Sequence, residues 1–334
     1  MNGLDFCLYF KRLNLHLSPA PIIRTLTFLP CSGSIKSQTS YKEKFVFIFL
    51  CCILFLFFIC FPHAAVSASK QGLQLWFTQI LPTLLPFCVL SYVILRSEIL
   101  PKKFSACYIV LCGFLFGFPI GCKLTADFYS SNYISREKAS ALCCFTNNLS
   151  PVFVITAIQE ILQLPLSPVY VFLIYGIPFL YGMSMLLLYH RTPSSTQKET
   201  ASRFHMDMQI IDAGIIHGFE TLIKICGYII LFSIFCEMLQ TLPFPAHWFS
   251  LAATGFLEVT NGVALLSTSA CTRQIKSLLA VLFLSWGGLS GIFQVSSILH
   301  QTGLSLRNYV LQKIILLLLT VGCCIPLLFL GILI

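Results

Sequence analysis

Long apolar stretches alternate with short polar ones along most of the chain. An α-helix crosses a bilayer with about 17 to 25 predominantly apolar residues. Runs of this kind predict spans over residues 45–61, 72–95, 167–189, 218–240, 247–270, 277–299 and 310–334. The pattern therefore predicts an all-α polytopic membrane protein.

The apolar pattern is interrupted twice between residues 104 and 162. Residues 104–120 have the length of a half-helix and end in Gly117-Phe118-Pro119-Ile120-Gly121, and a second interruption follows at Asn147-Asn148-Leu149-Ser150-Pro151. Broken backbone inside a membrane survives only where it is buried in protein or lines a wet cavity. Two such breaks indicate a binding site near the bilayer midplane. The alternative is a pair of proline-kinked helices packed through small residues.

The second half of the chain repeats this arrangement. Glu258-Val259-Thr260-Asn261-Gly262 interrupts one run, and Gly287-Gly288-Leu289-Ser290-Gly291 interrupts the next. At an offset of 287 − 147 = 140 residues, Leu149 meets Leu289, Ser150 meets Ser290 and Phe153 meets Phe293. Each half then reads as a span, a broken half-helix, a polar turn, a broken span and a span.

Basic residues between the spans predict the topology. Lys42 and Lys44 precede the first run and place the N-terminus in the cytoplasm, because cytoplasmic loops are rich in Lys and Arg. If 104–140 is a re-entrant hairpin, the two halves have opposite orientation, as in many secondary transporters. Arg273 and Lys276 then lie on the outer side, against this rule.

Four segments follow from this pattern. We expect a poorly ordered extension over residues 1–40, a first transmembrane repeat over 41–189 with its leading span at 45–61, a cytoplasmic linker over 190–209 and a second repeat over 210–334.

Composition narrows the function classes. The 334 residues are 57% hydrophobic and 10% charged, which excludes an ordinary soluble domain. The formal net charge of +9 is explained by basic cytoplasmic loops and does not indicate nucleic-acid binding. Most of the 16 cysteines lie in apolar runs without metal-ligand spacing, and no catalytic or nucleotide-binding motif appears. We therefore expect that the protein is not an enzyme and that it has no metal site and no cofactor.

Two ionisable residues stand out inside apolar sequence. Lys123 follows the first break and either holds a carboxylate of an anionic substrate or extends to the membrane interface. Glu258 either couples transport to H⁺ or Na⁺ or pairs with Lys123 across the repeats.

The remaining candidates surround the breaks, where small or polar residues either contact substrate or satisfy freed backbone groups. The full expected substrate site is Gly117, Pro119, Gly121, Lys123, Thr125, Asn147, Asn148, Ser150, Glu258, Thr260, Asn261, Gly287, Gly288, Ser290 and Gln294.

Several of these stretches resemble a known family. GLQLWFTQILPTLLPF, GFPIGCKLTADFYSSNYISREKASALCCFTNNLSPVF, GFLEVTNGVALLS and WGGLSGIFQVSSIL are similar to the YlbJ-type sporulation integral membrane proteins, of the wider nucleoside transporter and ferrous-iron transport Gate-domain group. The resemblance covers about residues 45–334, and Cys122 stands where the family often has Ala.

This resemblance implies a fold similar to concentrative nucleoside transporters and a function in endospore formation. The expected function is movement of a small organic anion, dipicolinic acid, toward the forespore, for cortex and core maturation. The alternatives are a nucleoside-type carrier and a non-transporting scaffold. The implied location is the bacterial cytoplasmic membrane, as the outer forespore membrane during sporulation. The expected partners are the lipid bilayer and the anion, with either self-association or other sporulation membrane proteins.

Overall fold

The computed structural model describes residues 41–189, 207–241 and 247–331. The expected extension at 1–40 and most of the linker therefore lie outside the described residues. The described residues form helices and connections without a strand. The chain divides into two compact units, residues 1–55 and 56–334. The helix α2 (Tyr41–Cys60) lies across this division, and everything below concerns the larger unit.

Five helices of the described residues are long and apolar enough to cross a membrane, at Pro62–Arg96, Pro168–Leu188, Met208–Thr241, Arg273–His300 and Leu306–Phe329. The prediction of an all-α polytopic membrane protein is confirmed. The second predicted span is longer than expected, since helical backbone starts at Pro62 rather than at residue 72. It also contains a π-helical segment, Trp76–Ile80, ahead of its two prolines.

The larger unit contains two runs of elements, and each run has a long leading helix, a short helical hairpin, a broken span and a final span. The first consists of α3 (Pro62–Leu75), η3 (Trp76–Ile80), α4 (Leu81–Arg96), η4 (Lys102–Phe104), α5 (Ser105–Phe116), α6 (Ile120–Ser130), α7 (Arg136–Phe145), α8 (Pro151–Ile155), η5 (Thr156–Ile161), α9 (Pro168–Val171), η6 (Phe172–Gly176) and α10 (Ile177–Tyr189). The second consists of α11 (Met208–Thr241), α12 (His247–Leu257), α13 (Val259–Thr268), α14 (Arg273–Trp286), α15 (Leu289–His300) and α16 (Leu306–Phe329).

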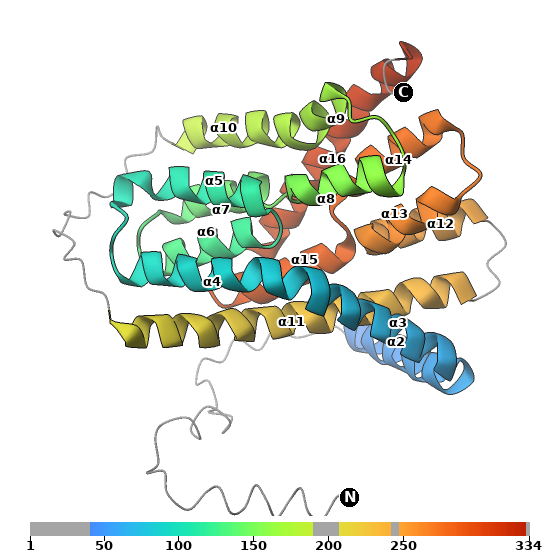
Figure 1. Cartoon of the computed structure of the whole chain (residues 1–334), viewed down its shortest axis with the longest axis horizontal. Coiled ribbons are helices and arrows are strands. Elements are labelled where there is room, and N and C mark those ends of the chain that lie inside the picture. The colour runs from blue at the N-terminus through green and yellow to red at the C-terminus, as the bar shows by residue number, and fades with distance from the viewer. Residues whose placement is uncertain (1–40, 190–206, 242–246, 332–334) are drawn as a thin grey trace, which may run out of the picture. The chain divides into compact units, whose positions relative to one another are not determined.

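The leading helices of the two runs pack side by side in opposite directions. An added Cβ at Gly72 on α3 would lie 3.0 Å from Ser233 Oγ, near the end of α11. At Gly214, near the start of α11, it would lie 3.3 Å from the Tyr92 ring of α4. Figure 1 shows the same reversal, because α4 and α11 cross the unit in opposite senses. The leading helices thus run in opposite directions, while the inverted repeat and its boundaries stay a prediction.

Each run contains a short helical hairpin where a full span would otherwise be. The pairs α5–α6 and α12–α13 consist of helices of 10 to 12 residues. Helices of that length extend about 15 to 18 Å, roughly half of the hydrocarbon core. One cluster of buried apolar side chains surrounds the first hairpin and another surrounds the second.

Basic side chains gather at one end of the unit. Lys102 Nζ lies over the Tyr133 ring, which joins the α4–α5 connection to the α6–α7 connection. Arg136 Nη2 donates to Gly303 O at 3.2 Å, which joins α7 to the α15–α16 connection. These connections and the residues that flank them, 96–104, 131–138 and 301–307, are called the basic end below. Its charge indicates a cytoplasmic position.

The second hairpin depends on close backbone contact. A Cβ added at Gly262 on α13 would overlap Gly255 Cα on α12. We therefore expect Gly262→Ala to lower the free energy of unfolding by about 1–3 kcal/mol, the usual cost of overpacking. Thermal unfolding of the protein in lipid nanodiscs measures this.

The matched control is Gly227→Ala on α11, where an added Cβ has no atom within 4 Å. Because alanine favours helix over glycine, this variant is expected to be as stable as the parent or slightly more so. Equal unfolding temperatures for both variants would contradict the close approach of α12 and α13.

Candidate site at the helix breaks

The breaks in each run contact one another. In the first run, Phe118 N–H donates to Asn148 O at 2.5 Å, and a Cβ at Gly117 would lie 2.8 Å from that same oxygen. In the second run, a Cβ at Gly288 would lie 3.2 Å from Leu257 O. Gly117 and Gly288 have φ angles of +69° and +82°, which glycine adopts without a steric penalty. In both runs, the break inside the short hairpin therefore packs against the break in the span that follows it.

The two pairs of breaks meet around a small enclosed space. It is lined by Phe118, Asn147, Asn148, Leu149, Leu284, Ser285, Trp286, Gly287, Gly288, Gly291, Ile292, Tyr309 and Lys313. Its volume is about 10 Å³, enough for about one water molecule. A larger ligand can enter only after the surrounding helices move apart. We call this space the central cavity.

A buried lysine from α16 reaches the central cavity. The Lys313 side chain is 4% exposed, and its Nζ donates to Asn147 O at 2.8 Å and to Asn148 Oδ1 at 3.3 Å. These acceptors follow the C-terminal end of α7, where the helix dipole favours a cation. Within the described residues, no carboxylate forms an ion pair with Lys313. A lysine ammonium has three donors, so one remains available.

The two asparagines are held in place by their other contacts. Asn147 Oδ1 accepts from Cys122 N at 3.4 Å, and its Nδ2 donates to Tyr309 Oη at 2.8 Å. Asn148 Nδ2 donates to Phe145 O at 2.6 Å. Their buried amides therefore link α6, α7 and α16 around the lysine.

The structure gathers part of the expected site in the central cavity. Asn147, Asn148, Gly287 and Gly288 line it. Most of the others satisfy local structure, beginning with Gly121, which packs against Thr146, and Pro119, the residue before α6. Thr125 Oγ1 donates to Gly121 O, Ser150 caps α8, and Gln294 Nε2 donates to Ser290 Oγ. Thr260 lies half-buried in the first turn of α13.

The two charged candidates have neighbours that differ from those expected. Lys123 is buried rather than extended to the interface, and its Nζ donates to Asp127 Oδ1 at 2.5 Å. Glu258 caps α13, where its Oε2 accepts from Asn261 N at 2.8 Å. The alternative that Glu258 pairs with Lys123 is therefore wrong. Glu258 sits on the second hairpin, where free N–H groups at a helix start attract a carboxylate.

Sequence reasoning missed Lys313 and Tyr309. The signal for Lys313 was present, because it is a cation inside the last apolar run, and such residues are costly and usually functional. Tyr309 carried no comparable signal, since a tyrosine near a span end is ordinary in a membrane protein. Among the residues that the structure describes, no three His, Cys, Asp or Glu side chains come together as metal ligands.

The hydrogen bond between Tyr309 and Asn147 can be tested directly. Tyr309→Phe keeps the ring but leaves the buried Asn147 amide without its acceptor, which is expected to cost about 1–3 kcal/mol of unfolding free energy. Thermal unfolding in nanodiscs measures the loss. Tyr133→Phe at the basic end, where the ring alone contacts Lys102, is expected to match the parent. A fully stable Tyr309→Phe protein would show that this contact is dispensable.

Comparison with known proteins identifies a relative. No protein-family model matches the chain, and no solved structure matches it. The chain is 25% identical over 309 residues to the sporulation integral membrane protein YlbJ of Bacillus subtilis (strain 168). The match covers 77% of this chain and 76% of the relative. This similarity and the apolar helices agree with the resemblance to the YlbJ-type sporulation integral membrane proteins.

Proposed function

We propose that this sporulation membrane protein is a secondary transporter for a small organic anion, and that the anion binds at the central cavity. The observation that carries the proposal is Lys313, a buried cation beside the breaks without a carboxylate partner in the described residues. A buried charge is costly unless it is paired. An anionic substrate supplies the missing partner when it binds.

Other groups around the cavity suit an anion with two carboxylates. The N-cap residue of α15 is Gly288, whose lack of a side chain leaves the first N–H groups of the helix without a side-chain cap. Such N–H groups and the helix dipole favour negative charge. One carboxylate would then contact Lys313 and the other the start of α15, with the asparagine amides between them.

Dipicolinate fits this description. It is a flat pyridine ring with a carboxylate on each side of the nitrogen, and the aromatic residues Phe118, Trp286 and Tyr309 line the cavity. Aromatic side chains pack well against a flat ring. The sporulation relative makes this anion the first candidate, because dipicolinate belongs to spore formation. In this proposal the protein moves it toward the forespore.

The inverted arrangement supports transport rather than a purely structural role. The two hairpins approach the central cavity from opposite ends of the unit, and each packs on its own broken span. Movement of one hairpin opens the cavity to one side of the membrane, while movement of the other opens it to the opposite side. This is alternating access around a fixed site. The volume of about 10 Å³ then corresponds to a closed conformation of the site.

Uptake of labelled dipicolinate into proteoliposomes tests the proposal. We expect the parent to take up the anion and Lys313→Gln to lose at least about tenfold in uptake, because a hydrogen bond to a charged group contributes about 1.5–3 kcal/mol. Lys276→Gln is the matched control, since Lys276 also donates to a backbone carbonyl, that of Ser267, but on α14 away from the cavity. The control is expected to transport like the parent.

The alternatives give different results in the same assay. A nucleoside-type carrier would take up labelled uridine and depend little on Lys313. Absence of uptake for both solutes, with sodium and proton gradients supplied, would contradict the transporter and favour a scaffold.

A further inference from the structure

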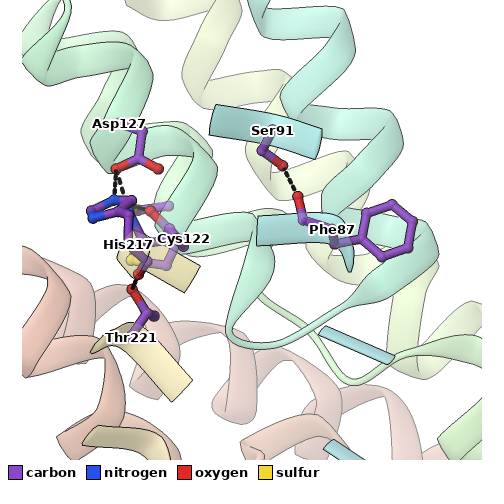
Figure 2. Close-up of polar contacts among 8 residues, drawn as sticks. Phe87, Ser91, Cys122, Asp127, His217 and Thr221 are labelled. Atoms are coloured by element: carbon purple, nitrogen blue, oxygen red, sulfur yellow. Dashed lines mark hydrogen bonds and ion pairs between the residues drawn. The ribbon is translucent and has the colours of Figure 1, made fainter. Parts of the chain in front are cut away.

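A second polar cluster lies beside the breaks and plays no part in the central cavity. It consists of Lys123 and Asp127 on α6 and His217 on α11. Lys123 Nζ is 2.5 Å from Asp127 Oδ1 and 2.7 Å from His217 Nε2. His217 Nε2 is also 3.8 Å from Asp127 Oδ1. Figure 2 shows the Asp127 carboxylate and the His217 ring facing each other. Three ionisable side chains thus meet between the first hairpin and the second run.

The three side chains differ in how much of their surface is exposed. Their exposed fractions are 11% for Lys123, 22% for Asp127 and 33% for His217. His217 lies nine residues after the start of α11, about 14 Å along the helix, on the side of the basic end. A proton from that side therefore reaches the imidazole before it reaches the other two groups.

The distances require a particular protonation state in this structure. Lys123 is a donor only, so the 2.7 Å contact exists when His217 Nε2 carries no proton and accepts. Addition of a proton at Nε2 places two cationic donors against each other. The protonated ring then has an acceptor at hand in Asp127, which lies 3.8 Å away, while Lys123 is repelled.

We propose that His217 Nε2 is the binding site of the proton that drives transport, and that its protonation transfers Asp127 from Lys123 to His217. This inference rests on the proposed transport function. The proton comes from water at Nε2 and returns to water from the same atom when Lys123 resumes its contact with Asp127. Protonation thereby replaces the ion pair within α6, and the Lys123–His217 hydrogen bond between α6 and α11, by an ion pair between Asp127 on α6 and His217 on α11.

The chemistry of the cluster favours a proton over a sodium ion. Sodium, like other hard cations, is held by several oxygen ligands. Within the described residues, the side-chain partners of the Asp127 carboxylate are nitrogen atoms, Lys123 Nζ and His217 Nε2. A lysine ammonium against the carboxylate also repels any metal cation. A histidine, by contrast, exchanges protons in the physiological range.

The groups around the cluster do not compete for this role. Cys88 and Tyr92 come from α4, Cys112 and Tyr108 from α5, Cys122 from α6 and Cys143 from α7. Thiols and phenols of this kind are neutral at neutral pH. Further charged or titratable groups are exposed, and they include Arg96 beyond Tyr92 on α4, Asp212, Glu220 and Lys224 on α11, and His300 at the end of α15. Within the described residues, the carboxylate in contact with His217 is that of Asp127.

The cluster is connected to the central cavity through the start of α6. Lys123 N donates to Pro119 O in the first break. Its neighbour Cys122 donates to Asn147 Oδ1, and Asn147 O accepts from Lys313. A shift of α6 toward α11 therefore displaces the residues that hold the lysine at the cavity. Protonation of His217 thereby changes anion binding at the central cavity.

The first experiment compares accumulation with exchange in proteoliposomes. A gradient of one pH unit sustains at most about tenfold accumulation per coupled proton. We expect the parent to accumulate dipicolinate under such a gradient and His217→Gln to reach only equal concentrations, so that the ratio of accumulation to exchange falls. His300→Gln, an exposed histidine at the end of α15, is the control and keeps the parent ratio.

The outcomes separate the two proposals. Unchanged accumulation by His217→Gln overturns the proton site and leaves the transporter intact. If the parent itself transports no dipicolinate, the transport proposal fails, and the proton site is judged by ¹⁵N NMR of the imidazole in nanodiscs. We expect the Nε2 signal of His217 to differ between samples at pH 8 and pH 5, from that of an unprotonated acceptor to that of a protonated ring. No change over this range overturns the inference.

Discussion

The structure depends on the need to satisfy backbone hydrogen bonds inside a membrane. Four helices end near the middle of the described unit. The bilayer interior supplies no water to form hydrogen bonds with their free N–H and C=O groups. The breaks therefore serve as partners for one another, as in the bond from Phe118 N–H to Asn148 O. Glycines at Gly117 and Gly288 allow the backbones to approach closely enough for this. The polar centre of the protein follows from that requirement.

Buried charges are placed where this broken backbone can stabilise them. Lys313 donates to a buried backbone carbonyl and to an asparagine side chain, while Glu258 accepts from an N–H group at the start of α13. In each case a helix end supplies the opposite partial charge. Lys123 differs, since it is neutralised by Asp127 on its own helix and leaves no net charge on that pair. The charges at the breaks thus have distinct roles despite similar burial.

Much of the fold could be predicted from the sequence, and less of the site. The breaks at Asn147–Asn148 and Gly287–Gly288 were visible because glycine, proline and asparagine are rare in the middle of apolar runs, and they line the central cavity as expected. The pairing of Lys123 with Asp127 could also be predicted, since Asp127 follows Lys123 at the spacing of one helical turn. The contacts of His217 with Lys123 and of Lys313 with Asn147 could not be predicted. Each joins helices about 90 or more residues apart in the sequence, and apolar runs do not indicate which helix faces pack together. Contacts of that kind require the three-dimensional packing of the helices.

The two hairpins occupy matching places but are chemically unequal. The first carries Lys123 and Asp127, and the positions 140 residues later on the second are Val263 and Ser267. Movement of the first hairpin therefore carries an ion pair through a low-dielectric region, whereas movement of the second carries uncharged side chains at those positions. Opening toward the two sides of the membrane then differs in free energy even without a gradient. In the proposed transport cycle, the protein therefore has a preferred resting orientation even when no gradient is present.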